Sequence, residues 1–175
     1  MSTVLIFELL HYLIFCIAVP MIIVKRAWPA MTVIIFSAIT NLMGERLNAY
    51  ITKVAVWSPE YLLWFPGGKI PVYVIVAGPL LSLLIYGISV LILHRLPWRL
   101  FLAIPVIALL GLTSPYIELF GLTMGLWRWQ PPHHFDLQTS YWGVYDYYLK
   151  YVFFAAYLGW FPREFIIFWK KSKKK

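Results

Sequence analysis

The chain has 175 residues, of which 62% are hydrophobic and only 13% are charged, whereas a soluble domain is typically about half apolar and a quarter charged. A water-soluble fold of this length could not bury so much apolar surface, so the composition excludes a soluble domain and predicts contact with lipid. The net charge of +8 does not indicate a nucleic-acid partner, because five of the 15 Lys and Arg residues lie in the last six positions, a distribution typical of membrane topology.

Five segments are long and apolar enough to be predicted membrane spans, since a spanning helix needs about 20 mainly apolar residues. They cover residues 4–24, 29–50, 70–93, 98–127 and 142–161. The tail, residues 162–175, is apolar on one side and ends in lysines, which predicts a basic cytoplasmic anchor at the interface or a continuation of the last helix. The predicted fold class is therefore all-α, a polytopic helix bundle forming a single transmembrane domain over residues 1–175.

The positions of the basic residues predict the orientation of the bundle. One group comprises Lys25, Arg26, Arg95, Arg99 and the C-terminal lysines. The other group lies at the opposite span ends, beside most of the acids, and comprises Arg46, Lys53, Lys69, Arg128 and Lys150. The positive-inside rule assigns the first group to the cytoplasm. We therefore expect a multi-pass protein with its N-terminus outside and its C-terminus inside, and an aromatic belt at the outer interface formed by Trp57, Trp64, Trp127, Trp129 and Trp142.

Ionisable residues at membrane depth are costly and mark candidate functional sites. Four predicted helices carry them at the same, outer depth. We expect Glu45, Glu118 and Asp146 to be catalytic, and Glu8, His11, Arg46 and Arg128 to support them. The alternative is that the acids face water, or form the charge pairs Glu45–Arg46 and Glu118–Arg128. A single Glu8-x-x-His11 pair does not complete a di-iron site, so no metal is predicted.

A short internal echo relates the two halves of the chain. Glu45 is followed by Trp57 and then by a Gly-to-Tyr segment that opens the third span, and Glu118 is followed by Trp129 and a similar segment. This pattern predicts a pseudo-repeat of two hairpins about an axis along the membrane normal, which makes Glu45 and Glu118 equivalent. Helix breakers lie at Pro79 in the third predicted span and at Gly111, Ser114 and Pro115 in the fourth. They predict an interruption of each helix, which either lines a cavity or is a packing kink.

Carboxyl groups among aromatic residues, which make up 19% of the chain, suit one kind of chemistry. A buried carboxyl can stay protonated and act as a general acid, and aromatic faces attract cations. Together they favour protonation of a carbon–carbon double bond, followed by capture of the carbocation by water or by another double bond. The candidates to bind substrate and shelter the cation, or otherwise to anchor the helices at the interface, are Tyr116, Trp127, Trp129, Tyr141, Trp142, Tyr145 and Tyr147.

Residues 121–129, with their Gly-x-Trp-x-Trp stretch, together with Tyr141–Val144 and Gly159–Trp160, resemble the second half of the membrane carotenoid biosynthesis protein family. That family includes hydratases that add water to the ends of acyclic carotenoids. Gly44–Glu45 and Gly68–Pro71 resemble its earlier Glu-bearing segment, and Tyr145 stands where the family has a proline. The resemblance implies that Glu45 and Glu118 are the functional acids and that a polyisoprenoid substrate lies along the helices.

The predicted function is a membrane-embedded enzyme that hydrates, cyclises or isomerises an isoprenoid or other lipid without a cofactor. Two other hypotheses stay open. One is a non-enzymatic small membrane subunit, or a pigment- or lipid-binding scaffold of a larger complex. The other is a transporter or sensor with an outward-facing site, which at this size needs a homo-oligomer. The enzyme hypothesis requires one cavity, between the second, fourth and fifth predicted helices, that contains both Glu45 and Glu118.

Overall fold

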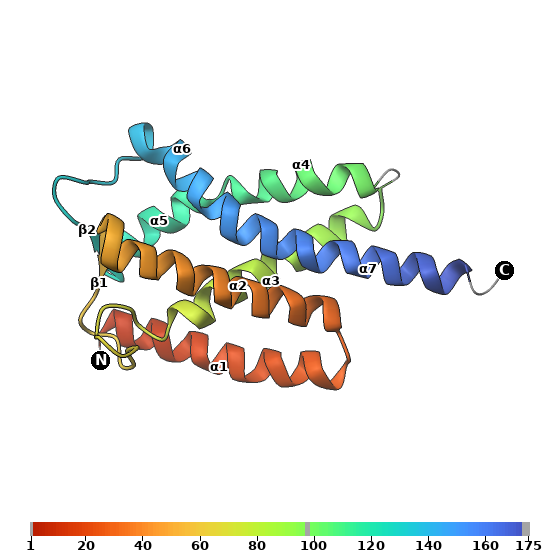
Figure 1. Cartoon of the computed structure of the whole chain (residues 1–175), viewed down its shortest axis with the longest axis horizontal. Coiled ribbons are helices and arrows are strands. Elements are labelled where there is room, and N and C mark those ends of the chain that lie inside the picture. Colours follow the sequence, from red (N-terminus) through yellow and green to blue (C-terminus); the bar gives the residue numbers. More distant parts are fainter. Residues whose placement is uncertain (1, 97–98, 173–175) are drawn as a thin grey trace.

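The computed structural model describes residues 2–96 and 99–172, most of which are helical (Figure 1). The α-helices are α1 (Thr3–Val24), α2 (Trp28–Leu47), α3 (Val74–Leu93), α4 (Arg99–Gly111), α5 (Ser114–Thr123), α6 (Leu137–Tyr148) and α7 (Phe154–Ser172). Two π-helical turns, η1 (Asn48–Thr52) and η2 (Leu149–Phe153), continue α2 and α6, and two short strands, β1 (Ala55–Trp57) and β2 (Trp127–Trp129), follow η1 and α5.

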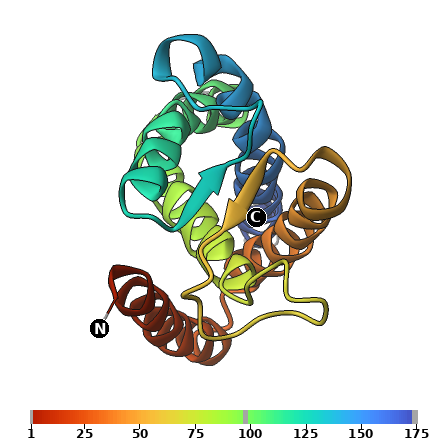
Figure 2. The same cartoon turned by 90° about the vertical axis from the view of Figure 1, so that its left-hand side faces the viewer.

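The long helices run side by side along the long axis of the molecule (Figure 1). Helix α2 packs against α3 and α7, and α3 also packs against α4 and α7. Helix α1 contacts α2 and α3 and lies at the edge of the bundle in the end-on view (Figure 2). The N-terminus and the strands lie at one end of the bundle, and the α1–α2 connection and the C-terminal end of α7 lie at the other (Figure 1).

Three helical stretches are long and apolar enough to cross a membrane, namely Thr3–Val24, Val74–Leu93 and Phe101–Thr123. They correspond to the first, third and fourth predicted spans, so the five-span prediction is confirmed only in part. The other two predicted spans also form helices, as α2 and as α6 with η2 and α7. Large apolar side chains such as Leu13 (59% exposed) and Leu91 (67%) face outward, and an exposed apolar surface of this extent requires an apolar covering.

Several predicted boundaries differ from the observed helices. The fourth predicted span is broken between Gly111 and Ser114, where Pro115 opens α5, because proline fits the first turn of a helix but not its interior. Pro79 does not end α3, which continues through it. The tail continues α7 to Ser172, the second of the two predicted alternatives. The predicted start at Trp98 and the last lysines, residues 173–175, lie outside the described residues.

The strand pair is a feature of the described fold that an all-α prediction misses. Strands β1 and β2 pair antiparallel, with Val56 opposite Arg128, Ala55 opposite Trp129, and Trp57 opposite Trp127. The pair lies across the end of the bundle (Figure 2). An antiparallel pair has local two-fold symmetry about its centre. The strands that follow Glu45 and Glu118 therefore pair with each other, and the two-hairpin repeat stays a prediction.

Candidate functional site

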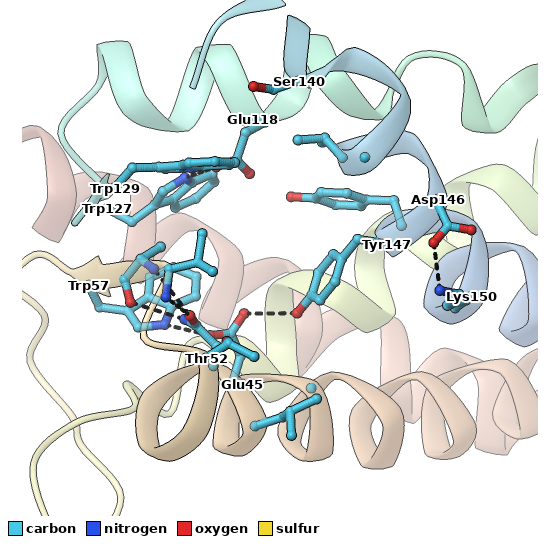
Figure 3. Close-up of a pocket in the computed structure, with 18 of the residues that line it drawn as sticks. Glu45, Thr52, Trp57, Glu118, Trp127, Trp129, Ser140, Asp146, Tyr147 and Lys150 are labelled. Carbon is cyan, nitrogen blue, oxygen red and sulfur yellow. Dashed lines mark hydrogen bonds and ion pairs between the residues drawn. The ribbon is translucent and has the colours of Figure 1, made fainter. Parts of the chain in front are cut away.

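A cavity of about 630 Å³ opens beside the strand pair, where the ends of α2, α5 and α6 meet (Figure 3). Both Glu45 and Glu118 line it, so the cavity that the sequence analysis required is present. The rest of its wall is mostly apolar or aromatic and comprises Gly44, Leu47, Asn48, Thr52, Val54, Ala55, Trp57, Trp127, Trp129, Thr139, Ser140, Gly143, Val144, Asp146, Tyr147, Tyr148 and Lys150.

Glu45 lies in the last turn of α2 and is held by three neutral donors. Its Oε2 accepts hydrogen bonds from Trp57 Nε1 at 3.0 Å and Asn48 Nδ2 at 3.3 Å, and its Oε1 accepts one from the Tyr147 hydroxyl at 3.5 Å. Asn48 also fixes the strand, because its Oδ1 accepts from the backbone N–H groups of Val54 and Ala55 at 3.0 and 3.1 Å. The π-turn and this asparagine therefore place the Trp57 indole against Glu45.

Glu118 lies in α5 and is 8% exposed. Its Oε1 accepts hydrogen bonds from two indoles, Trp127 Nε1 at 2.7 Å and Trp129 Nε1 at 2.6 Å. Tyr148 also lines the cavity and interacts electrostatically with Glu118. Gly121, one turn further along α5, provides the room for this arrangement, because a Cβ there would lie 2.0 Å from Trp127 Cη2. Both glutamates thus accept hydrogen bonds from tryptophans of the paired strands, Glu45 from one and Glu118 from two.

The two carboxyl groups come from opposite walls and point into the same space (Figure 3), close enough to interact electrostatically. Arg46 and Arg128 are exposed, and over residues 2–96 and 99–172 neither glutamate forms an ion pair with a lysine or arginine. The charge pairs Glu45–Arg46 and Glu118–Arg128 are therefore not formed. Every described partner of the two acids is a neutral N–H or O–H group.

Asp146 lines the cavity at its rim, where it forms an ion pair with Lys150 (Figure 3). Both side chains are mostly exposed. This position differs from those of Glu45 and Glu118, because an exposed, paired carboxylate is solvated and neutralised. A catalytic role for Asp146 stays a prediction, with less support from the geometry than the other two acids have.

Glu8 and His11 do not line the cavity. Glu8 is fully buried and accepts hydrogen bonds from the Tyr12 hydroxyl and the Leu62 backbone N–H, both at 2.7 Å. His11 Nδ1 lies 2.8 Å from the Phe7 carbonyl oxygen. The Glu8–Leu62 hydrogen bond attaches the loop between β1 and α3 to α1, whereas the His11 contact lies within α1.

The predicted aromatic residues divide into two groups. Trp127, Trp129 and Tyr147 line the cavity, whereas Tyr116, Tyr141, Trp142 and Tyr145 do not. The hydroxyl groups of Tyr141 and Tyr145 donate to the carbonyls of Leu112 and Ala108, at 2.6 and 3.1 Å, and thereby fasten α6 to the end of α4. Tyr116 and Trp142 are exposed.

Among the cavity residues that interact with the two acids, Asn48, Trp57 and Tyr148 were absent from the predicted site. The internal echo contained a signal for Trp57, because it occupies the same place after Glu45 that Trp129 occupies after Glu118. The sequence had no comparable signal for Asn48, whose contacts depend on the π-turn and on β1.

The arrangement suits acid–base chemistry on an apolar molecule. The described residues contain no group of three or more His, Cys, Asp or Glu side chains that could hold a metal ion. Two carboxyl groups across one aromatic cavity can instead give a proton on one side and take one on the other. The chain matches no protein-family model, no curated protein and no solved structure.

Proposed function

We propose that this protein is a multi-pass membrane enzyme that protonates a carbon–carbon double bond of an isoprenoid or a similar lipid. The observation that carries the proposal is the pair Glu45 and Glu118. They are two carboxyl groups without a described cationic partner, held by indole and phenol groups on opposite walls of one cavity. An ion pair would favour the charged form of each carboxyl group, and transferring a proton from that group to a substrate would then be costly.

The reaction begins when the carboxylic acid of one glutamate transfers its proton to one carbon of the double bond. The π electrons form the new C–H bond, and the neighbouring carbon becomes a carbocation. Trp57, Trp127 and Trp129 line the space in which that charge develops, and aromatic faces stabilise cations.

The second carboxylate determines how the carbocation is discharged. If it takes a proton from water while the water oxygen bonds to the cation, the product is an alcohol. If it takes a proton from a carbon next to the cation, the product is an isomer in which the double bond has a new position. Attack by another double bond before proton loss gives a ring. None of these outcomes oxidises or reduces the substrate, so none needs a redox cofactor.

The size of the cavity supports a long apolar substrate that enters by one end. Its volume of about 630 Å³ lies within the range of about 300–1,000 Å³ that is usual for small-molecule sites. It accommodates the end of a long polyene and leaves the rest to lie along the apolar helix surfaces in lipid. The resemblance of residues 121–129 to carotenoid biosynthesis proteins supports the same class of substrate.

The proposed topology has five spans, with the N-terminus outside and the C-terminus in the cytoplasm. Lys25, Arg26 and Arg95 follow the C-terminal ends of α1 and α3, at the end of the bundle opposite the strands (Figure 1). By the positive-inside rule that end faces the cytoplasm. The cavity then opens in the outer half of the membrane.

The test is to express the protein in a host that makes linear polyenes and to compare lipid extracts by mass spectrometry. Hydration adds the mass of one water, whereas cyclisation and isomerisation leave the mass unchanged and shift retention. Glu118→Gln should abolish the product in a folded protein, and Glu60→Gln, a change at an exposed loop acid, should not. Lipids unchanged by the wild type would contradict the proposal, and an active Glu118→Gln variant would exclude Glu118 as a catalytic group.

A further inference from the structure

The hydrogen bonds of the two glutamates determine which oxygen of each can carry a proton. Indole N–H and amide NH₂ groups only donate, so an oxygen that accepts from them cannot direct a proton at them. Glu118 Oε1 accepts from two indoles, and Glu45 Oε2 accepts from one indole and one amide. The proton of a neutral Glu118 therefore belongs on Oε2, and that of a neutral Glu45 belongs on Oε1.

Two neighbouring tyrosines line the cavity with the carboxyl groups, and each hydroxyl can both donate and accept a proton. The Tyr147 hydroxyl lies 3.5 Å from Glu45 Oε1, the oxygen left for the proton. Tyr148 interacts electrostatically with Glu118. Their rings lie next to each other, with centroids 5.8 Å apart, and both residues line the cavity. They end α6, immediately before the π-turn η2, and such turns often occur at functional sites.

The charges in the cavity favour a single shared proton. Two carboxylates in one apolar space repel each other, and carboxyl groups that interact in this way titrate as one coupled unit. No lysine or arginine in the described chain forms an ion pair with either glutamate. The state with one acid and one carboxylate is also the state that the proposed reaction needs at its start.

We infer that Glu45 and Glu118 hold one proton between them, and that Tyr147 and Tyr148 return this proton across the cavity after each reaction. This inference rests on the proposed function for its second half only. When Glu118 has given its proton to the substrate and Glu45 has taken one from water, Glu45 passes a proton to Tyr147. Tyr147 passes its own hydroxyl proton to Tyr148, and Tyr148 passes its own hydroxyl proton to Glu118. Both tyrosines end as neutral hydroxyl groups, and the pair is restored.

The shared proton can be tested without a substrate. A hydrophobic carbodiimide, dicyclohexylcarbodiimide, reacts with protonated carboxyl groups, and intact mass with peptide mapping counts and locates its adducts on the full chain in lipid nanodiscs. We expect one adduct per chain, divided between Glu45 and Glu118, and in Glu45→Gln one adduct at Glu118 alone. No adduct at either glutamate, or two on the same chain, would overturn the shared proton whether or not the protein makes a product.

The role of the tyrosines is tested by comparing first and later turnovers. Tyr147→Phe and Tyr148→Phe should slow steady-state product formation by about 100-fold, a typical contribution of a positioned proton-transfer group, and should slow the first turnover much less. A small diffusible acid such as imidazolium should restore the lost rate, which it could not do if the tyrosines only packed the site. Tyr50→Phe, at an exposed tyrosine, is the matched control. Unchanged steady-state rates, or a slow rate that imidazolium does not restore, would overturn the relay.

Discussion

Replacing Gly121 with alanine should displace the Trp127 indole from Glu118 while leaving every titratable group in place. The added Cβ would lie 2.0 Å from Trp127 Cη2 and 2.1 Å from Cζ2, whereas carbon atoms normally approach to about 3.5–4.0 Å. The ring must therefore move by about 1.5 Å, which breaks the 2.7 Å hydrogen bond from Trp127 Nε1 to Glu118 Oε1. Overpacking costs about 1–3 kcal/mol, and the lost hydrogen bond costs about as much again.

Alanine also favours a helix over glycine by about 1 kcal/mol, so the net loss of stability should be about 1–5 kcal/mol. For a chain of this length, that loss lowers the thermal midpoint by roughly 2–20 °C. Circular dichroism of the protein in nanodiscs measures the midpoint, and indole fluorescence reports the movement of the ring. Gly87→Ala is the matched control, because a Cβ at this α3 glycine meets nothing within 4 Å. If Gly121→Ala proves as stable as Gly87→Ala with an unchanged indole spectrum, Gly121 does not position Trp127.

Three further substitutions test contacts outside the acid pair. Glu8→Leu deprives the Leu62 N–H of its acceptor, and we expect a loss of about 3 kcal/mol and faster hydrogen exchange at Leu62, with a smaller loss for Glu8→Gln. The Tyr61 hydroxyl is buried without a partner in the described part of the chain, and burial raises the pKa of Tyr61 above its usual range. Tyr61→Phe should therefore raise stability by about 1 kcal/mol in denaturation measurements, and lower stability would reveal an unseen partner. Asp146→Asn removes an exposed ion pair with Lys150 and should change the unfolding free energy by less than about 1 kcal/mol, so a larger loss would show that the pair is structural.

The sequence predicted the two central acids because their depth in apolar helices is a property of the chain alone. Glu45 and Glu118 each lie near the same end of a long apolar segment, and each is followed by a tryptophan about a dozen residues later. Depth does not reveal function by itself, however. Glu8 lies at a similar depth, yet its carboxyl group holds the Leu62 backbone, a contact that depends on where a distant loop returns.

The rotation of α6 could not be predicted from the sequence. Tyr141 and Tyr145, four residues apart, face α4 and donate to its carbonyls, whereas Val144, Tyr147 and Tyr148 face the cavity. All these residues belong to one aromatic run without a polar face, so periodicity does not distinguish its two sides. The strand pair escaped prediction for a similar reason, because three residues in each strand are too few to show an alternating pattern.

The central claim is that Glu45 and Glu118 act as a unit on one substrate molecule. The most direct test measures the rate of product formation in membranes that contain the wild type, Glu45→Gln, Glu118→Gln or the double variant at equal folded amounts. When two groups act together in catalysis, the effects of substituting them on the rate are not additive. Each single substitution should therefore reduce the rate by about 10²–10⁴-fold, and the double variant should be no slower than the slower single variant. A single variant that keeps the wild-type rate, or losses that multiply in the double variant, would contradict the claim.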